Sequence, residues 1–153
     1  MKVDYSKFER DESLYGEVTV KDFDGSEITI KAELVENEDE EIPEAEKETL
    51  EFFVDNYLKY KQFLLKPIFE YYQKCRKAWG AIAADDRRFP EISDMNKMYE
   101  MVSLYAIAVL DENNYGKRSI SLYYNCTWDE EEGMGIMVSE FNVVKIGNSG
   151  DVY

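Results

Sequence analysis

The sequence predicts an α+β fold: a mostly antiparallel sheet of about six strands with one long helix, kinked or split, packed on one face. Two observations support this prediction. Apolar and polar residues alternate with the period of a strand before residue 35 and again after residue 117. Between them, apolar residues recur at the three- and four-residue spacing of a helix. A parallel strand pair is expected only where the helical segment carries the chain from the first hairpin to the next strand.

The composition is that of one folded domain. The chain has 153 residues, of which 44% are hydrophobic and 14% aromatic, enough apolar material to bury a core. We therefore treat residues 1–153 as a single α+β domain. Residues 1–12 have no clear period and are expected to be a frayed lead-in, and residues 147–153 a loose tail.

The first element is a hairpin. Residues 14–23 and 26–34 alternate at period two, and Asp24 and Gly25 between them favour a type I′ turn. Because one register is apolar and the other charged, one face of the hairpin should lie on the core and the other in water.

The next element is the helix. Seven of the eleven residues 36–46 are acidic, which indicates a solvated loop leading into a helix, or an acidic recognition surface. The helical pattern runs from Glu44 to Trp79 and contains Pro67. Because proline lacks a backbone N–H and clashes with the preceding turn, we expect a kink there or two helices that meet.

The C-terminal half returns to strands. Residues 81–101 read as a loop and a short helix, and the apolar residues 102–110 as a central strand. Residues 118–128 alternate, with Cys126 and Trp128 in the apolar register. Residues 134–138 and 142–146 complete a meander.

Four consecutive acids follow Trp128, and they are the candidate binding residues together with it. We expect this segment to form a hairpin tip, in which two glycines allow the chain to turn back. The tip is a solvated turn, a binding surface or a cation site, although it lacks the alternating ligand spacing of an EF-hand loop. The binding candidates are Trp128, Asp129, Glu130, Glu131 and Glu132, and the turn residues are Gly133 and Gly135.

Several chemistries are excluded. The chain has no histidine, which removes His-based triads and His-ligated metals, and it has no glycine-rich phosphate loop. Cys75 and Cys126 lack the CxxC spacing and are expected to be buried free thiols. We therefore predict no catalytic residue, no metal ligand and no cofactor, which leaves only an enzyme that works with carboxylates.

The charge indicates what the protein binds. The net charge is −15, and residues 1–51, with 6 basic and 18 acidic groups, carry −12 of it. Such a surface repels nucleic acid and anionic membranes and favours a basic protein partner. We find neither a membrane-spanning apolar run nor a signal peptide, and expect a cytoplasmic protein.

The acidic segment also carries a resemblance. Trp128, Asp129, Glu130 and Glu131, with the two glycines that follow, are similar to the Trp-Asp-Glu-Glu-His-Gly-Leu-Gly signature of a family of small bacterial domains of unknown function. The resemblance covers most of the chain and implies a relation to predicted immunity proteins of polymorphic toxins. Glu132 stands where the signature has histidine, so no role of that histidine carries over.

Three functions remain open. The leading hypothesis is a non-enzymatic acidic protein-binding module in the bacterial cytoplasm, such as an immunity protein that covers the basic site of a toxin. The alternative is a carboxylate-dependent enzyme or a divalent-cation-binding domain that uses residues 129–132. The third is a structural or oligomeric role, with Tyr71, Tyr123 or Phe141 at an interface; the oligomeric state is left open.

Overall fold

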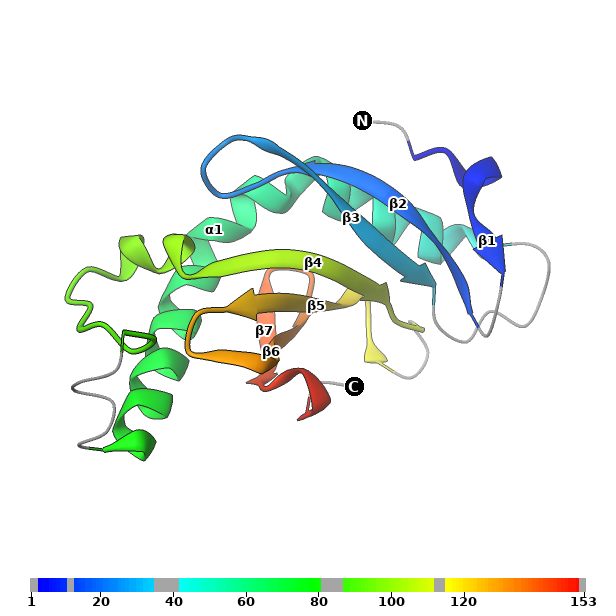
Figure 1. Cartoon of the computed structure of the whole chain (residues 1–153). Coiled ribbons are helices and arrows are strands. Elements are labelled where there is room, and N and C mark those ends of the chain that lie inside the picture. The colour runs from blue at the N-terminus through cyan, green and yellow to red at the C-terminus, as the bar shows by residue number, and fades with distance from the viewer. Residues whose placement is uncertain (1–2, 11–12, 35–41, 81–86, 112–114, 152–153) are drawn as a thin grey trace.

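A computed structural model describes residues 3–10, 13–34, 42–80, 87–111 and 115–151. It confirms the α+β class: seven strands form one sheet whose spatial order follows the chain, and a single long helix crosses one face (Figure 1). The strands are β1 (Glu9–Arg10), β2 (Leu14–Lys21), β3 (Glu27–Leu34), β4 (Val102–Val109), β5 (Ser119–Cys126), β6 (Asp129–Ser139) and β7 (Asn142–Gly147). The helices are α1 (Glu44–Trp79) and the short 3₁₀ helices η1 (Tyr5–Lys7), η2 (Met95–Glu100) and η3 (Ser149–Asp151).

The prediction of about six strands is one short. The additional strand, β1, has two residues and lies in the segment expected to be a frayed lead-in, where no alternation marks it. It pairs with Leu14 and Tyr15 of β2, so its register comes from β2 rather than from its own sequence. At the other end of the chain, η3 packs against β6 and β7.

The type I′ turn predicted for the β2–β3 hairpin is wrong. Asp24 does not adopt the positive φ that a type I′ turn requires, and only Gly25 does, at +87°. The Asp22 N–H instead donates to the Ser26 carbonyl at 2.8 Å, which makes a three-residue loop. Asp24 Oδ1 stabilises this loop by accepting from the Ser26 N–H at 2.9 Å.

Helix α1 is one continuous element and is not split at Pro67. The residues on both sides of the proline, Leu64, Leu65 and Ile68, are buried, and burial of this apolar face offsets the lost backbone hydrogen bond. The helix leads from β3 to β4, which form the expected parallel pair. All other neighbouring strands are antiparallel.

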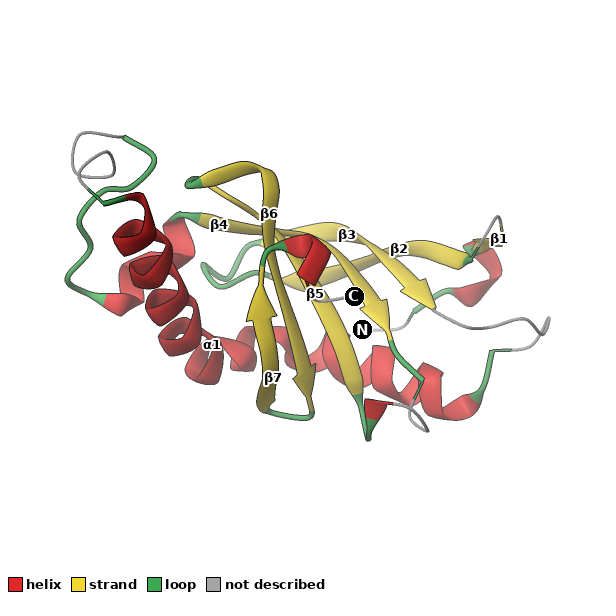
Figure 2. Ribbon diagram, turned by 90° about the horizontal axis from the view of Figure 1, so that it is seen from below, coloured by secondary structure: helices red, strands yellow, loops and turns green. Residues whose placement is uncertain are grey.

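The core lies between α1 and the sheet face that it covers (Figure 2). Rows of apolar residues cross the strands in register, as in Ile107, Leu122 and Ile136. The hydroxyls of Tyr57 on α1 and Tyr124 on β5 meet at 2.8 Å inside this core. No helix in the described ranges is long and apolar enough to span a membrane.

Candidate functional site

The acidic residues 129–132 lie in β6, next to the connection of the β5–β6 hairpin, and not at the tip of that hairpin as expected. Thr127 and Trp128 connect β5 to β6, and β6 begins at Asp129. Cys126 is opposite Asp129, whereas Tyr124 is opposite Met134, so residues 130–133 form a bulge facing a single residue of β5. A bulge of this kind bends the strand and turns its extra residues away from the ladder.

Gly133 permits the bulge. Both glycines expected to form the turn, Gly133 and Gly135, lie within β6. Gly133 has a φ of +67°, and a Cβ atom added there would lie 2.4 Å from the Tyr124 carbonyl oxygen. No other residue could take this conformation at this distance without displacing the backbone. Gly135 lies opposite Tyr123 in the regular part of the ladder.

Trp128 anchors the bulge in the core. Its side chain is 3% exposed, and its ring lies 4.9 Å from the ring of Tyr72 and 6.4 Å from that of Tyr71. Tyr72 in turn stacks on Phe89. The Trp128 Nε1 is buried, makes no hydrogen bond to the described residues, and lies beside the Cys75 thiol.

Asp129 holds the start of the bulge. Its Oδ1 accepts a hydrogen bond from the Glu132 N–H at 3.0 Å, an arrangement by which an aspartate stabilises a local turn. Burial raises the pKa of the Tyr71 hydroxyl, and the Cys75 thiol and the Asp129 carboxylate nearby raise it further. The Asp129 carboxylate therefore holds the backbone of the bulge at Glu132 and lies near Tyr71 and Cys75.

The three glutamates point to solvent. Glu130, Glu131 and Glu132 are exposed, and none forms an ion pair with a described residue. No group of three or more His, Cys, Asp or Glu side chains within the described ranges is arranged to hold a metal ion. The cation-site reading of residues 129–132 therefore finds no support in their geometry.

The cysteines are both free, as expected, with Cys126 buried and Cys75 half-buried. Burial raises the pKa of the Cys126 thiol to about 12. Burial also raises the pKa of the Cys75 thiol, against contacts with Tyr71 and Trp128 that lower it. Because the thiolate is the reactive form, neither cysteine is activated as a nucleophile.

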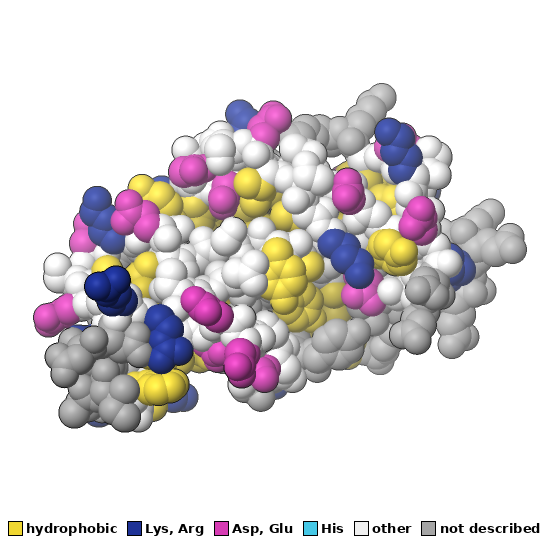
Figure 3. Space-filling view, viewed as in Figure 1, with side chains coloured by type: hydrophobic (Ala, Val, Ile, Leu, Met, Phe, Trp, Pro, Cys, Tyr) yellow, Lys and Arg dark blue, Asp and Glu magenta, His cyan; other side chains and the backbone are white. Residues whose placement is uncertain are grey.

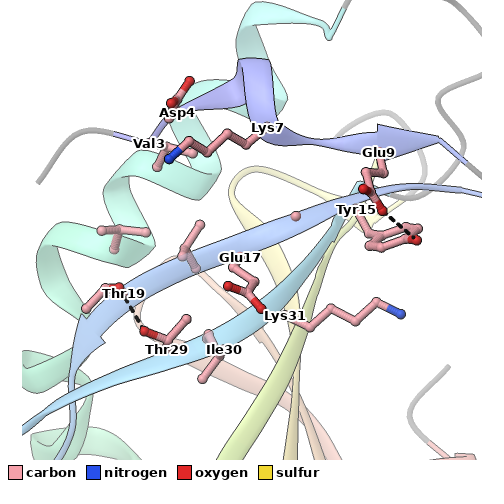
Figure 4. A pocket seen from close by; sticks show the side chains of 13 residues that line it. Val3, Asp4, Lys7, Glu9, Tyr15, Glu17, Thr19, Thr29, Ile30 and Lys31 are labelled. Atoms are coloured by element: carbon pink, nitrogen blue, oxygen red, sulfur yellow. Dashed lines mark hydrogen bonds between the residues drawn. The ribbon is translucent and has the colours of Figure 1, made fainter.

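A second feature, a cavity of about 880 Å³ beside β2, was not anticipated from the sequence. It lies between β2, Val54 of α1 and the N-terminal segment, and Figure 4 shows Val3 and Lys7 facing β2 across it. Its charged lining is mixed: Asp4, Glu9, Glu17, Lys7 and Lys31. The only sequence signal for it was the alternation of β2, since residues 3–10 have no pattern.

The comparisons with known proteins identify a family without a known activity. A family model described as a domain of unknown function (DUF6985) matches residues 4–153. No curated protein and no solved structure matches the chain significantly.

Proposed function

The chain belongs to the DUF6985 family of unknown function, and we propose that it is a non-enzymatic acidic module that binds a basic protein. The observation that carries the proposal is the bulge of β6, which presents Glu130, Glu131 and Glu132 to solvent from a fixed backbone. In the finer form of the proposal the protein is bacterial and cytoplasmic, and its partner is a toxin whose basic active site the glutamates cover.

The bulge suits binding because it is ordered before a partner arrives. Trp128 packs in the core beside the bulge, and Asp129 accepts a hydrogen bond from the bulge backbone. Gly133 brings the bulge into close contact with the Tyr124 backbone. A preorganised surface loses little conformational entropy on association, which favours affinity. Because Trp128 is buried, the proposal assigns it the role of anchor and assigns the partner contacts to the three glutamates.

The chemistry of the partner follows from the charge. Three carboxylates without an ion pair among the described residues attract Lys and Arg side chains, and the net charge of −15 adds long-range attraction. The sheet face seen in Figure 3 shows acidic and basic side chains interspersed. Residues 129–132 are an unbroken run of acids, and they therefore offer Lys and Arg side chains a more specific contact than interspersed charges of both signs do.

The proposal is tested by charge reversal with a matched control. The variant E130K/E131K/E132K reverses the bulge, and E48K/E70K/E91K makes the same change in net charge at three other exposed glutamates. Each is co-expressed with the product of the neighbouring gene, and cell survival and the dissociation constant of the purified pair are measured.

We expect the bulge variant to lose binding and protection, and the control to retain most of both. Binding of the unmodified protein should weaken as salt is raised, because the contacts are electrostatic. Equal effects of the two triple variants would contradict the proposal, as would survival no better than without the protein.

A further inference from the structure

The edge of the sheet at β2 is largely open. Residues 14–21 of β2 pair with β3 on one side. On the other side β1 pairs only with Leu14 and Tyr15, so among the described residues no strand pairs with residues 16–21 there. Figure 1 shows β1 at one end of β2, with the rest of that edge at the margin of the sheet. The cavity beside β2 leaves space along the same edge, between residues 16–19 and the N-terminal segment that carries Val3 and Lys7.

The hairpin loop determines which backbone groups face this edge. Asp22 is hydrogen-bonded to Ser26 across the loop, and in an antiparallel pair hydrogen-bonded and non-hydrogen-bonded positions alternate. Thr19 is therefore a non-hydrogen-bonded position opposite Thr29, as the 3.0 Å contact between their Oγ1 atoms also indicates. The N–H and C=O groups of Glu17, Thr19 and Lys21 point away from β3, toward the open edge.

The sequence of β2 nearly repeats in β3. Residues 17–21 read Glu-Val-Thr-Val-Lys and residues 27–31 read Glu-Ile-Thr-Ile-Lys. Antiparallel pairing centred on the two threonines sets each glutamate opposite a lysine, Glu17 with Lys31 and Lys21 with Glu27. A strand of this sequence is thus complementary to an antiparallel copy of itself. β3, which nearly repeats the sequence, already pairs with one edge of β2 in this way.

We propose that the open edge of β2 pairs with β2 of a second copy of the chain, antiparallel and with the two-fold axis at Thr19. In this register Glu17 lies opposite Lys21 of the other copy, twice. Val18 lies opposite Val20 of the other copy on the other face. The outward N–H and C=O groups of Glu17, Thr19 and Lys21 form about six hydrogen bonds across the axis.

The charge pattern selects a second copy over other extended segments. Cross-strand pairs of opposite charge stabilise a sheet, and like charges opposite each other destabilise it. The edge with Glu17 and Lys21 therefore favours a strand that sets a lysine opposite Glu17 and a glutamate opposite Lys21, as a second copy of β2 does. The other edge of the sheet is less suitable, because β7 is interrupted by a bulge at Val144. A single strand pair is a small interface, so the dimer is weak and depends on concentration.

Two single variants and their mixture test the pairing. E17K gives the edge two lysines and K21E gives it two glutamates, so each alone places like charges opposite each other in the dimer. A mixture of the two sets opposite charges at both pairs. E27K is the matched control, because it disturbs the hairpin inside one copy as E17K does but leaves the open edge unchanged.

The measurement is sedimentation velocity over a range of protein concentrations. We expect the unmodified protein and E27K to dimerise with similar dissociation constants, E17K and K21E to be monomeric when separate, and their equimolar mixture to dimerise. T19P should also be monomeric yet folded by circular dichroism, because its missing N–H faces the open edge, where proline is tolerated. An unmodified protein that stays monomeric at the highest concentration overturns the proposal, and so does a mixture that stays monomeric.

Discussion

Replacing Gly133 by alanine tests whether the bulge is a fixed part of the fold. The added Cβ would lie 2.4 Å from the Tyr124 carbonyl oxygen, in a backbone conformation with φ +67°. The left-handed conformation costs a residue with a Cβ about 1–2 kcal/mol, and forcing the strand away from the carbonyl adds about 1–3 kcal/mol. We therefore expect a loss of about 3 kcal/mol in the free energy of unfolding.

The matched control is Gly25→Ala. Gly25 also has a positive φ, +87°, but no atom lies within 4 Å of its added Cβ, so this variant carries the conformational cost alone, about 1–2 kcal/mol. For a domain of this size each kcal/mol lowers Tm by about 2–4 °C.

The assay is urea unfolding followed by circular dichroism and by tryptophan fluorescence, with both variants made in a W79F background so that Trp128, the anchor of the bulge, is the one tryptophan left. G133A should lose about 2 kcal/mol more than G25A. Equal losses in the two variants would refute the reasoning, because the contact with Tyr124 would then carry no cost.

Three further predictions concern the core and the acids. Y57F and Y124F should each lose about 1–3 kcal/mol of unfolding free energy, because each leaves the other hydroxyl buried without its partner, and the double variant should lose less than the sum; urea unfolding of all four proteins measures this. Burial raises the pKa of Asp22, so the folded state binds its proton more tightly than the unfolded state does, and stability is lost as pH rises through the folded pKa. D22N should therefore gain in Tm relative to the unmodified protein as pH is raised from 3 to 7, and an unchanged difference in Tm would contradict the assignment. Ca²⁺, Mg²⁺ and Mn²⁺ should give no heat of binding and no rise in Tm, since the described acids form no cluster that could hold them; a saturable heat would revive the cation-binding alternative.

The elements with a strong period were predictable from the sequence. Alternation identified β2, β3 and β5, and helical spacing gave α1 its limits, with Pro43 before it and Gly80 after it. These patterns work because each element buries one face against the same core. Pro67 misled the prediction of a split, since burial on both sides of it holds the helix together.

The acidic segment was less predictable, for a physical reason. After Trp128 the alternation stops, which suggests a turn, yet the acids belong to the next strand, β6, which begins at Asp129 and bulges there. That bulge depends on the conformation of Gly133 and on a contact with Tyr124 across the ladder. The anchoring of Trp128 likewise depends on Tyr71 and Tyr72, which are distant in sequence.

The two-residue β1 and the hairpin loop show the same limit. No period can mark a strand as short as β1, whose pairing comes from Leu14 and Tyr15. Asp24 and Gly25 fit two loop lengths equally well, and hydrogen bonds from Ser26 to Asp24 favour the longer loop. Both outcomes depend on contacts that a local pattern does not contain.

The central claim is that Glu130, Glu131 and Glu132 contact a basic protein. The most direct measurement compares the dissociation constants of the unmodified protein, E130K/E131K/E132K and E48K/E70K/E91K for the same purified partner at one salt concentration. The account predicts a loss of at least about 100-fold, or 3 kcal/mol, for the bulge variant and a much smaller loss for the control. Dissociation constants that rise equally in the two variants would contradict it.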